Sequence, residues 1–109
     1  MDNNFKLRDN NITIPLLINN RHYNVQGILT IPEDSKGLVI FAHGSGSGRQ
    51  SPRNQYVAKV LNNYGISTLL LDLLTEEEEK VDDLTGEYRF NIELLADRLI
   101  SVTDWLLKQ

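Results

Sequence analysis

Cysteine is absent from this chain of 109 residues. Its absence excludes disulfide bridges, cysteine-based zinc sites and a thiol nucleophile. Histidine is scarce as well, since His22 and His43 are the two imidazoles available for acid–base or metal chemistry. From this composition we predict neither a metal site nor a cofactor.

Long apolar runs and basic clusters are also missing. No stretch approaches the roughly 20 apolar residues that span a bilayer, and the start 1–4 lacks the layout of a secretory signal. Eleven Lys and Arg stand against 15 Asp and Glu without a basic face, which argues against nucleic acid or acidic membranes as partners. We predict a cytoplasmic, single-domain protein with a modest core, burying about 60 to 70% of its unfolded surface.

Two β-rich runs open the structured part of the chain. Residues 1–11 are polar and predict a loose lead-in. The runs 12–18 and 23–31 meet at Asn19-Asn20, which is typical of an antiparallel hairpin. Pro15 has no N–H to donate, so we expect the first strand at a sheet edge.

A strand–helix–strand unit follows the hairpin. The runs 38–42 and 68–71 are apolar on both faces, as parallel strands covered by helices are. Between them, Ser51 and Pro52 predict a helix start and Gly65 its end. The apolar positions of this helix recur at helical spacing: Tyr56, Val57, Val60, Leu61 and Tyr64.

The last part of the chain predicts two more helices. Thr75 and Glu78 form a capping box that starts a short, solvated acidic helix. A longer helix is expected over 91–108, with Trp105 beside its buried stripe. That stripe consists of Ile92, Leu95, Ala96, Leu99, Val102 and Leu106. Such a pattern normally leads into another parallel strand, so we predict an α/β fold that is truncated at about half of a doubly wound sheet.

A glycine-rich loop directly follows the apolar run 38–42. It reads His43-Gly44-Ser45-Gly46-Ser47-Gly48 and could be a plain flexible turn. Its backbone N–H groups could also face an oxyanion or a phosphate. A nucleotide-binding βαβ unit is a weaker alternative, in which Gly46, Gly48 and Ser51 meet the phosphates and Asp72 holds the ribose.

Several blocks together resemble the front half of the dienelactone hydrolase family of α/β-hydrolases. These blocks are VIFAHGSGSG (39–48), SPRN (51–54), LDLLT (71–75), RFNI (89–92) and TDWL (103–106). The resemblance implies a partial α/β-hydrolase fold over 12–109, with an antiparallel hairpin before βαβα. It also implies activity on ester, lactone or related acyl bonds. By this carry-over the Ser45 N–H, with Gly44 beside it, faces the oxyanion, and His43 structures the loop.

The catalytic groups of that family are missing from this chain. The family needs a nucleophile on a G-x-S-x-G-like elbow, then an acid, then a histidine. Gly44 and Gly48 are the one glycine pair four apart, and Gly46 stands at their centre. Both histidines also precede every serine except Ser35, so the order cannot be drawn. We therefore predict a truncated chain that is inactive alone.

Because the catalytic groups are missing, we also predict a partner. The strand from Leu38 to Ala42 lies in the family beside a strand that this chain lacks, so its edge is expected to be bare. A second chain that supplies the C-terminal half could bind there, or two copies could associate. Arg49 and Arg53 flank the glycine loop and could attract an anion. The alternative to an enzyme is a non-catalytic interaction module or gene remnant.

Overall fold

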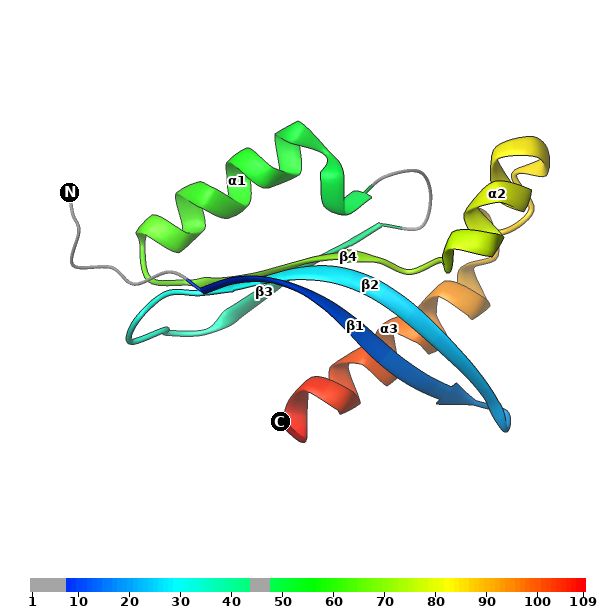
Figure 1. Cartoon of the computed structure of the whole chain (residues 1–109), viewed down its shortest axis with the longest axis horizontal. Coiled ribbons are helices and arrows are strands. Elements are labelled where there is room, and N and C mark those ends of the chain that lie inside the picture. The colour runs from blue at the N-terminus through cyan, green and yellow to red at the C-terminus, as the bar shows by residue number, and fades with distance from the viewer. Residues whose placement is uncertain (1–7, 44–47) are drawn as a thin grey trace.

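The computed structural model describes residues 8–43 and 48–109. Its elements are β1 (Arg8–Ile18), β2 (Arg21–Ile31), β3 (Leu38–His43), the 3-10 turn η1 (Gly48–Gln50), α1 (Pro52–Asn63), β4 (Ser67–Asp72), α2 (Glu76–Thr85) and α3 (Ile92–Leu107). The four strands form one sheet in the order β1-β2-β4-β3, with α1 above it and α3 below it in Figure 1. The predicted α/β architecture with a hairpin before βαβα is confirmed.

The hairpin forms because its turn suits the twist of two antiparallel strands. Asn19 and Asn20 have φ of 53° and 66°, the left-handed values that a tight two-residue turn requires. Pro15 lies in β1 at the sheet edge, as predicted. The predicted lead-in 1–11 was too long, because residues 8–11 already pair with 28–31 of β2. Backbone pairing does not depend on apolar side chains, so the polar run did not reveal this extension.

The two faces of the sheet alternate along each strand. In β4, Leu69 and Leu71 point to the α3 face and join its core, while Leu70 lines a cavity beside α1. The buried members of the α3-face core are Ile14, Leu16, Val25, Leu69, Leu71, Leu73 and Val102. Gly27 lets β2 approach β4 here, because a Cβ on it would lie 2.8 Å from Leu69 Cδ1.

The α1 face is held by smaller and more polar contacts. Ser51 caps α1 by accepting from the Asn54 amide, and Ala58 and Asn62 are the buried helix residues. The Asn62 amide group donates to Thr68 Oγ1 at 3.1 Å and to the Ile66 carbonyl at 2.9 Å. The apolar side chains predicted to recur at helical spacing are mostly exposed: Tyr56, Val57, Val60 and Tyr64.

Helix α3 buries only part of the predicted stripe. Leu95, Leu99 and Leu106 pack against the core around the fully buried Val102. Ile92 and Ala96 are exposed, so their predicted burial is wrong. The buried face is centred on Arg98 and Val102. Ile92 and Ala96 stand six positions before them, which turns their side chains away from this face.

Candidate functional site

The carboxyl ends of the two parallel strands meet at one edge of the sheet. His43 ends β3 and pairs in register with Asp72, which ends β4. The glycine-rich segment 44–47 connects β3 to η1 at this point. Ligands of open α/β sheets bind outside the carboxyl ends of the strands, so this edge is the candidate site.

Strand β4 and the residue after it hold the chain on both sides of 44–47. On one side, the Leu73 amide donates to the His43 carbonyl at 3.0 Å. On the other, the Arg49 amide donates to Asp72 Oδ1 at 2.8 Å, and the Arg49 guanidinium forms an ion pair with Asp72 Oδ2. The Asp72 side chain is 4% exposed. These contacts fix both ends of the glycine-rich segment on one strand end.

These contacts bear on three predicted roles. Arg49 is one of two arginines that could attract an anion, and in the structure its guanidinium is paired with Asp72. In the nucleotide-binding alternative Asp72 holds the ribose, and in the structure its carboxylate holds the preceding turn η1 instead. His43 is half-buried and anchors the start of the segment through its carbonyl. Gly44 and Ser45 lie outside the described residues, so their oxyanion role stays a prediction.

The Arg49–Asp72 ion pair changes the pKa of a carboxyl group on α2. Partial burial and the negative charge of Asp72 raise the pKa of Glu79, while the Arg49 guanidinium opposes the rise. Glu79 therefore takes up a proton more readily than an ordinary glutamate. The candidate site therefore contains one ion pair, Arg49–Asp72, and one carboxyl group, that of Glu79, whose charged form is disfavoured.

A buried ion pair joins α2 to α3 and was not predicted. Arg98 is 2% exposed, and its guanidinium pairs with both oxygens of Glu78. It also donates to the Leu73 carbonyl at 3.0 Å and lies 4.5 Å from the centre of the Tyr23 ring. A charged residue inside the apolar stripe of 91–108 was the signal that could have revealed it.

Glu78 serves the capping box and this ion pair together. Its carboxylate accepts from the Thr75 amide at 2.9 Å, and the Glu78 amide donates to Thr75 Oγ1, which confirms the predicted capping box. Burial pushes the pKa of Glu78 upward, but the hydrogen bonds from Arg98 and Thr75 prevail and hold it below the ordinary value. The expectation of a merely solvated helix is wrong here, because Glu78 fixes α2 to the core.

Asp82 makes a second fixed point on α2. Its side chain accepts from the amides of Tyr88 and Arg89 at 2.8 and 2.9 Å, and from the Arg89 guanidinium at 2.9 Å. Burial favours a higher pKa for Asp82, but these hydrogen bonds outweigh it and lower the pKa. Asp82 therefore holds the turn between α2 and α3, so α2 is anchored at both ends.

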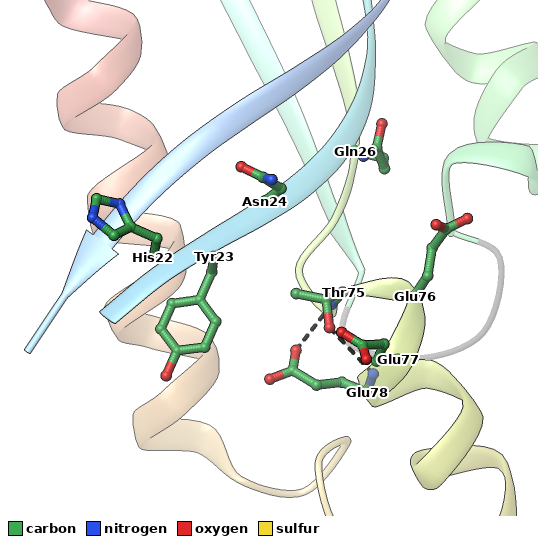
Figure 2. A pocket seen from close by; sticks show the side chains of 8 residues that line it. All are labelled: His22, Tyr23, Asn24, Gln26, Thr75, Glu76, Glu77 and Glu78. Atoms are coloured by element: carbon green, nitrogen blue, oxygen red, sulfur yellow. Dashed lines mark hydrogen bonds between the residues drawn. The ribbon is translucent and has the colours of Figure 1, made fainter. Parts of the chain in front are cut away.

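A polar cleft of about 580 Å³ lies between β2 and the start of α2 (Figure 2). It is lined by His22, Tyr23, Asn24, Gln26, Thr75, Glu76, Glu77 and Glu78. Glu78 is committed to Arg98 and Thr75, so it offers no free carboxylate. Within the described part of the chain, no group of three or more His, Asp or Glu side chains could hold a metal ion.

A solved structure matches nearly the whole chain. It is a dienelactone hydrolase from Anabaena variabilis ATCC 29413, which is 48% identical, with a TM-score of 0.80 over 93% of this chain. The chain matches a fragment of a dienelactone hydrolase-like α/β-hydrolase. This dienelactone hydrolase-like chain covers 46% of the solved chain, so it spans about half the length of that relative. No protein-family model matches it.

Two curated relatives of the dienelactone hydrolase-like chain come from Mycobacterium tuberculosis. Both carry the name "Putative phosphoribosyl transferase", one from strain CDC 1551 / Oshkosh and one from strain ATCC 25618 / H37Rv. Each is 58% identical over 85 residues, which is 78% of this chain and 18% of the relative. The matched segment is therefore a small part of each much longer relative.

Among the described helices, none has the length and apolar character needed to cross a bilayer.

Proposed function

We propose that this chain supplies the oxyanion-binding part of a dienelactone hydrolase-like enzyme that cleaves ester, lactone or related acyl bonds. The observation that supports it is the fixing of both ends of the glycine-rich segment on β4, through His43 on one side and the Arg49–Asp72 pair on the other. Backbone donors that stabilise a transition state must be held in place before the reaction, and these contacts provide such anchoring.

The chemistry assigned to the segment is electrostatic. A nucleophile adds to the acyl carbon, the carbonyl electron pair moves onto oxygen, and a tetrahedral oxyanion forms. The Ser45 amide, with Gly44 beside it, donates hydrogen bonds to that oxygen as the resemblance implies. Collapse of the intermediate breaks the acyl C–O bond, the base passes the proton of the nucleophile to the leaving oxygen, and water then releases the acyl group from the nucleophile. The nucleophile, acid and base are absent from this sequence in the required order, so the chain is inactive until another segment supplies them.

The test uses the 109-residue chain alone and fused to the unmatched part of the Anabaena dienelactone hydrolase. The chain alone is expected to hydrolyse p-nitrophenyl acetate at the background rate, and the fusion is expected to turn it over. In the fusion, Ser45→Pro removes the amide donor and should slow turnover about a hundredfold or more, since losing one oxyanion donor costs about 2.7 to 4 kcal/mol.

Ser45→Ala is the matched control, because it keeps the backbone N–H and should change turnover little. Equal rates for the two variants contradict the assigned donor. Saturable turnover by the chain alone, surviving His43→Ala and every Ser→Ala change, contradicts the missing triad.

Binding of a phosphorylated ribose is a second candidate, because the two mycobacterial relatives are named as phosphoribosyl transferases. The contacts of Asp72 argue against this candidate. Its carboxylate would have to accept a hydrogen bond from a ribose hydroxyl, but the side chain is 4% exposed and is already bonded to Arg49. Thermal-shift titrations with 5-phosphoribosyl diphosphate, NAD and ATP are expected to leave the melting temperature unchanged. A saturable rise with one of them favours this candidate over hydrolysis.

A non-catalytic interaction module remains the alternative to an enzyme. It predicts a fusion that folds as a single species, binds its complementary segment and shows no turnover. Ester assays on a fusion with verified secondary structure therefore separate the two classes directly.

A further inference from the structure

The polar cleft between β2 and α2 begins at the candidate site. Gln26, which lines the cleft, pairs in register with Asp72 of β4, and Asp72 pairs on its other side with His43. These three residues therefore form a row across the sheet at the edge where the parallel strands end. Neighbouring strands lie about 4.8 Å apart, so Gln26 stands about 10 Å from His43. The cleft is near enough to receive the part of a substrate that does not itself react.

The chemistry of the cleft differs from that of an ordinary ligand pocket. Its volume of about 580 Å³ lies within the usual range for ligand sites, but such sites are lined mainly by apolar side chains. Every residue that lines this cleft instead carries a hydrogen-bonding side chain (Figure 2). The cleft therefore suits a ligand whose surface is polar throughout.

The β2 wall supplies hydrogen-bond donors. His22, Asn24 and Gln26 alternate along the strand, so they project from the same face of the sheet (Figure 2). Gln26 Oε1 accepts from the Thr13 hydroxyl at 3.1 Å, which fixes the side-chain amide and leaves the Nε2 protons for a ligand. The Asn24 side-chain amide brings both a donor and an acceptor.

The α2 wall supplies acceptors. Glu76 and Glu77 are exposed, and neither forms an ion pair with a described residue. The Thr75 hydroxyl accepts from the Glu78 amide at 3.2 Å, so its own proton can be donated to a ligand. Carboxylates accept hydrogen bonds from hydroxyl groups and repel other anions. Because the two walls combine donors with acceptors, they match a set of hydroxyl groups, each of which donates and accepts.

Both walls are anchored in the fold. Strand β2 pairs with β1 on one side and with β4 on the other. The first turn of α2 is held by its capping box and by the bond between Glu78 and the buried Arg98. A ligand therefore meets side chains whose backbone is already in place, which lowers the entropic cost of binding.

We propose that this cleft is a substrate subsite for a neutral, hydroxyl-rich group, such as the polyol part of a sugar ester or of an aldonic-acid lactone. Asn24 and Gln26 hold that group by hydrogen bonds. Glu76 and Glu77 accept from its hydroxyls and exclude substrates that carry a carboxylate or phosphate there. The inference rests on the proposed function and names its substrate class.

Binding is measured on the full 109-residue chain by NMR, without any reaction. The probes are methyl glucopyranoside, which is neutral, and the methyl glycosides of glucuronic acid and of glucosamine, which carry opposite charges. The neutral glycoside is expected to shift the side-chain amide signals of Asn24 and Gln26 saturably. The glucuronide is expected to bind at least about tenfold more weakly, because two carboxylates face it. Saturable binding of the glucosamine glycoside alone, or of none of the three, overturns the proposal.

A double variant and its matched control locate the exclusion of anions. Glu76→Gln/Glu77→Gln should bring the affinity of the glucuronide close to that of the neutral glycoside. Glu93→Gln/Asp104→Asn changes the net charge equally, at exposed positions of α3 outside the cleft lining, and should leave the preference as it was. Equal effects of the two double variants overturn the role of the lining carboxylates.

A substitution on β2 tests the donors independently of α2. Asn24 is exposed, so Asn24→Leu removes its hydrogen bonds with little change in the packing of the sheet. It should weaken the neutral glycoside about tenfold. An unchanged affinity in a chain with unchanged circular dichroism overturns the assignment of Asn24.

Turnover separates this inference from the proposed function. The fusion with the unmatched part of the Anabaena dienelactone hydrolase is assayed with gluconolactone and with δ-valerolactone, which share a six-membered ring ester and differ in their hydroxyls. The kcat/KM is expected to be at least about tenfold higher for gluconolactone, and Asn24→Leu should narrow the ratio. Glycoside binding in the cleft without turnover of either lactone refutes the proposed hydrolase and supports the subsite as a binding site. Turnover with equal kcat/KM for both lactones overturns the subsite and leaves the hydrolase standing.

Discussion

The two faces of the sheet are built differently. The α3 face holds a continuous apolar core, in which Ile14, Val25, Leu69, Leu71 and Val102 are completely buried. The α1 face rests on small and polar contacts, and the helix turns much of its apolar surface outward. The α3 face therefore carries most of the stability that burial of apolar side chains provides, while the α1 face leaves apolar side chains exposed.

Breaking the Arg98–Glu78 pair is expected to have the largest effect. Arg98→Met keeps the side-chain volume but leaves the Glu78 carboxylate beside the core without its cation, which should cost about 3 to 5 kcal/mol. Urea unfolding followed by circular dichroism measures this loss. The double variant Arg98→Met/Glu78→Gln should recover much of it. A single variant that loses under about 1 kcal/mol contradicts the role given to the pair.

Equal truncations on the two faces test the comparison most directly. Leu71→Ala empties a site at the centre of the α3-face core and should cost about 4 kcal/mol. Leu70→Ala enlarges a cavity beside α1 that already exists and should cost closer to about 2 kcal/mol. Unfolding free energies of the pair measure the difference, and equal losses would show that both faces are packed alike.

The polar contact under α1 is expected to matter less. Asn62→Ala leaves the buried Thr68 hydroxyl without the amide that donates to it, at a cost of about 1 to 2 kcal/mol. Thr68→Val in the same chain removes the stranded group and should restore part of the loss. A double-mutant cycle on unfolding free energy yields the coupling, and a coupling of zero contradicts the contact.

The protonation of two neighbouring glutamates should change the stability with opposite signs, and the effect of Glu79 should be the smallest of all. The lowered pKa of Glu78 means that its contribution is present above the unfolded value near 4.5 and is lost as the pH falls through the lower folded value. The raised pKa of Glu79 means that its charged form opposes folding at neutral pH, and that this penalty disappears on acidification.

Glu79→Gln should therefore stabilise the chain at pH 7, and Glu78→Gln should destabilise it. The effect of Glu79→Gln should stay below about 1 kcal/mol because solvent screens this partly exposed group. Glu78→Gln leaves the buried Arg98 guanidinium without its carboxylate, so its loss should be close to that of Arg98→Met. Unfolding midpoints measured from pH 3 to 7 test the signs. A loss of stability at pH 7 in Glu79→Gln refutes the assigned cause.

Most of the fold could be predicted from sequence signals that act between neighbouring residues. Asn19-Asn20 predicted the hairpin turn, Ser51-Pro52 predicted the start of α1, and Thr75 with Glu78 predicted the start of α2. Each of these signals acts within a few residues, so the sequence contains the whole interaction. Pro15 likewise placed β1 at an edge because the loss of a donor is a property of that residue alone.

Burial and pairing between distant segments were harder to predict. Periodicity identified α1 and α3 as helices, but it could not show that Val57 and Ile92 face outward, because orientation depends on what covers them. Arg49–Asp72 and Arg98–Glu78 join residues 23 and 20 positions apart, and only the folded sheet brings them together. At the candidate site, the two strand ends were predicted and their ionic anchoring was not.

Pro15 sets a limit on how far this sheet can grow. The edge of β1 is interrupted by a residue without an N–H, whereas the edge of β3 presents three uninterrupted sets of donors and acceptors. Strand addition is therefore less favourable at β1 than at β3. Open-ended filaments need a free edge on both sides of a sheet, so the interrupted edge of β1 disfavours them.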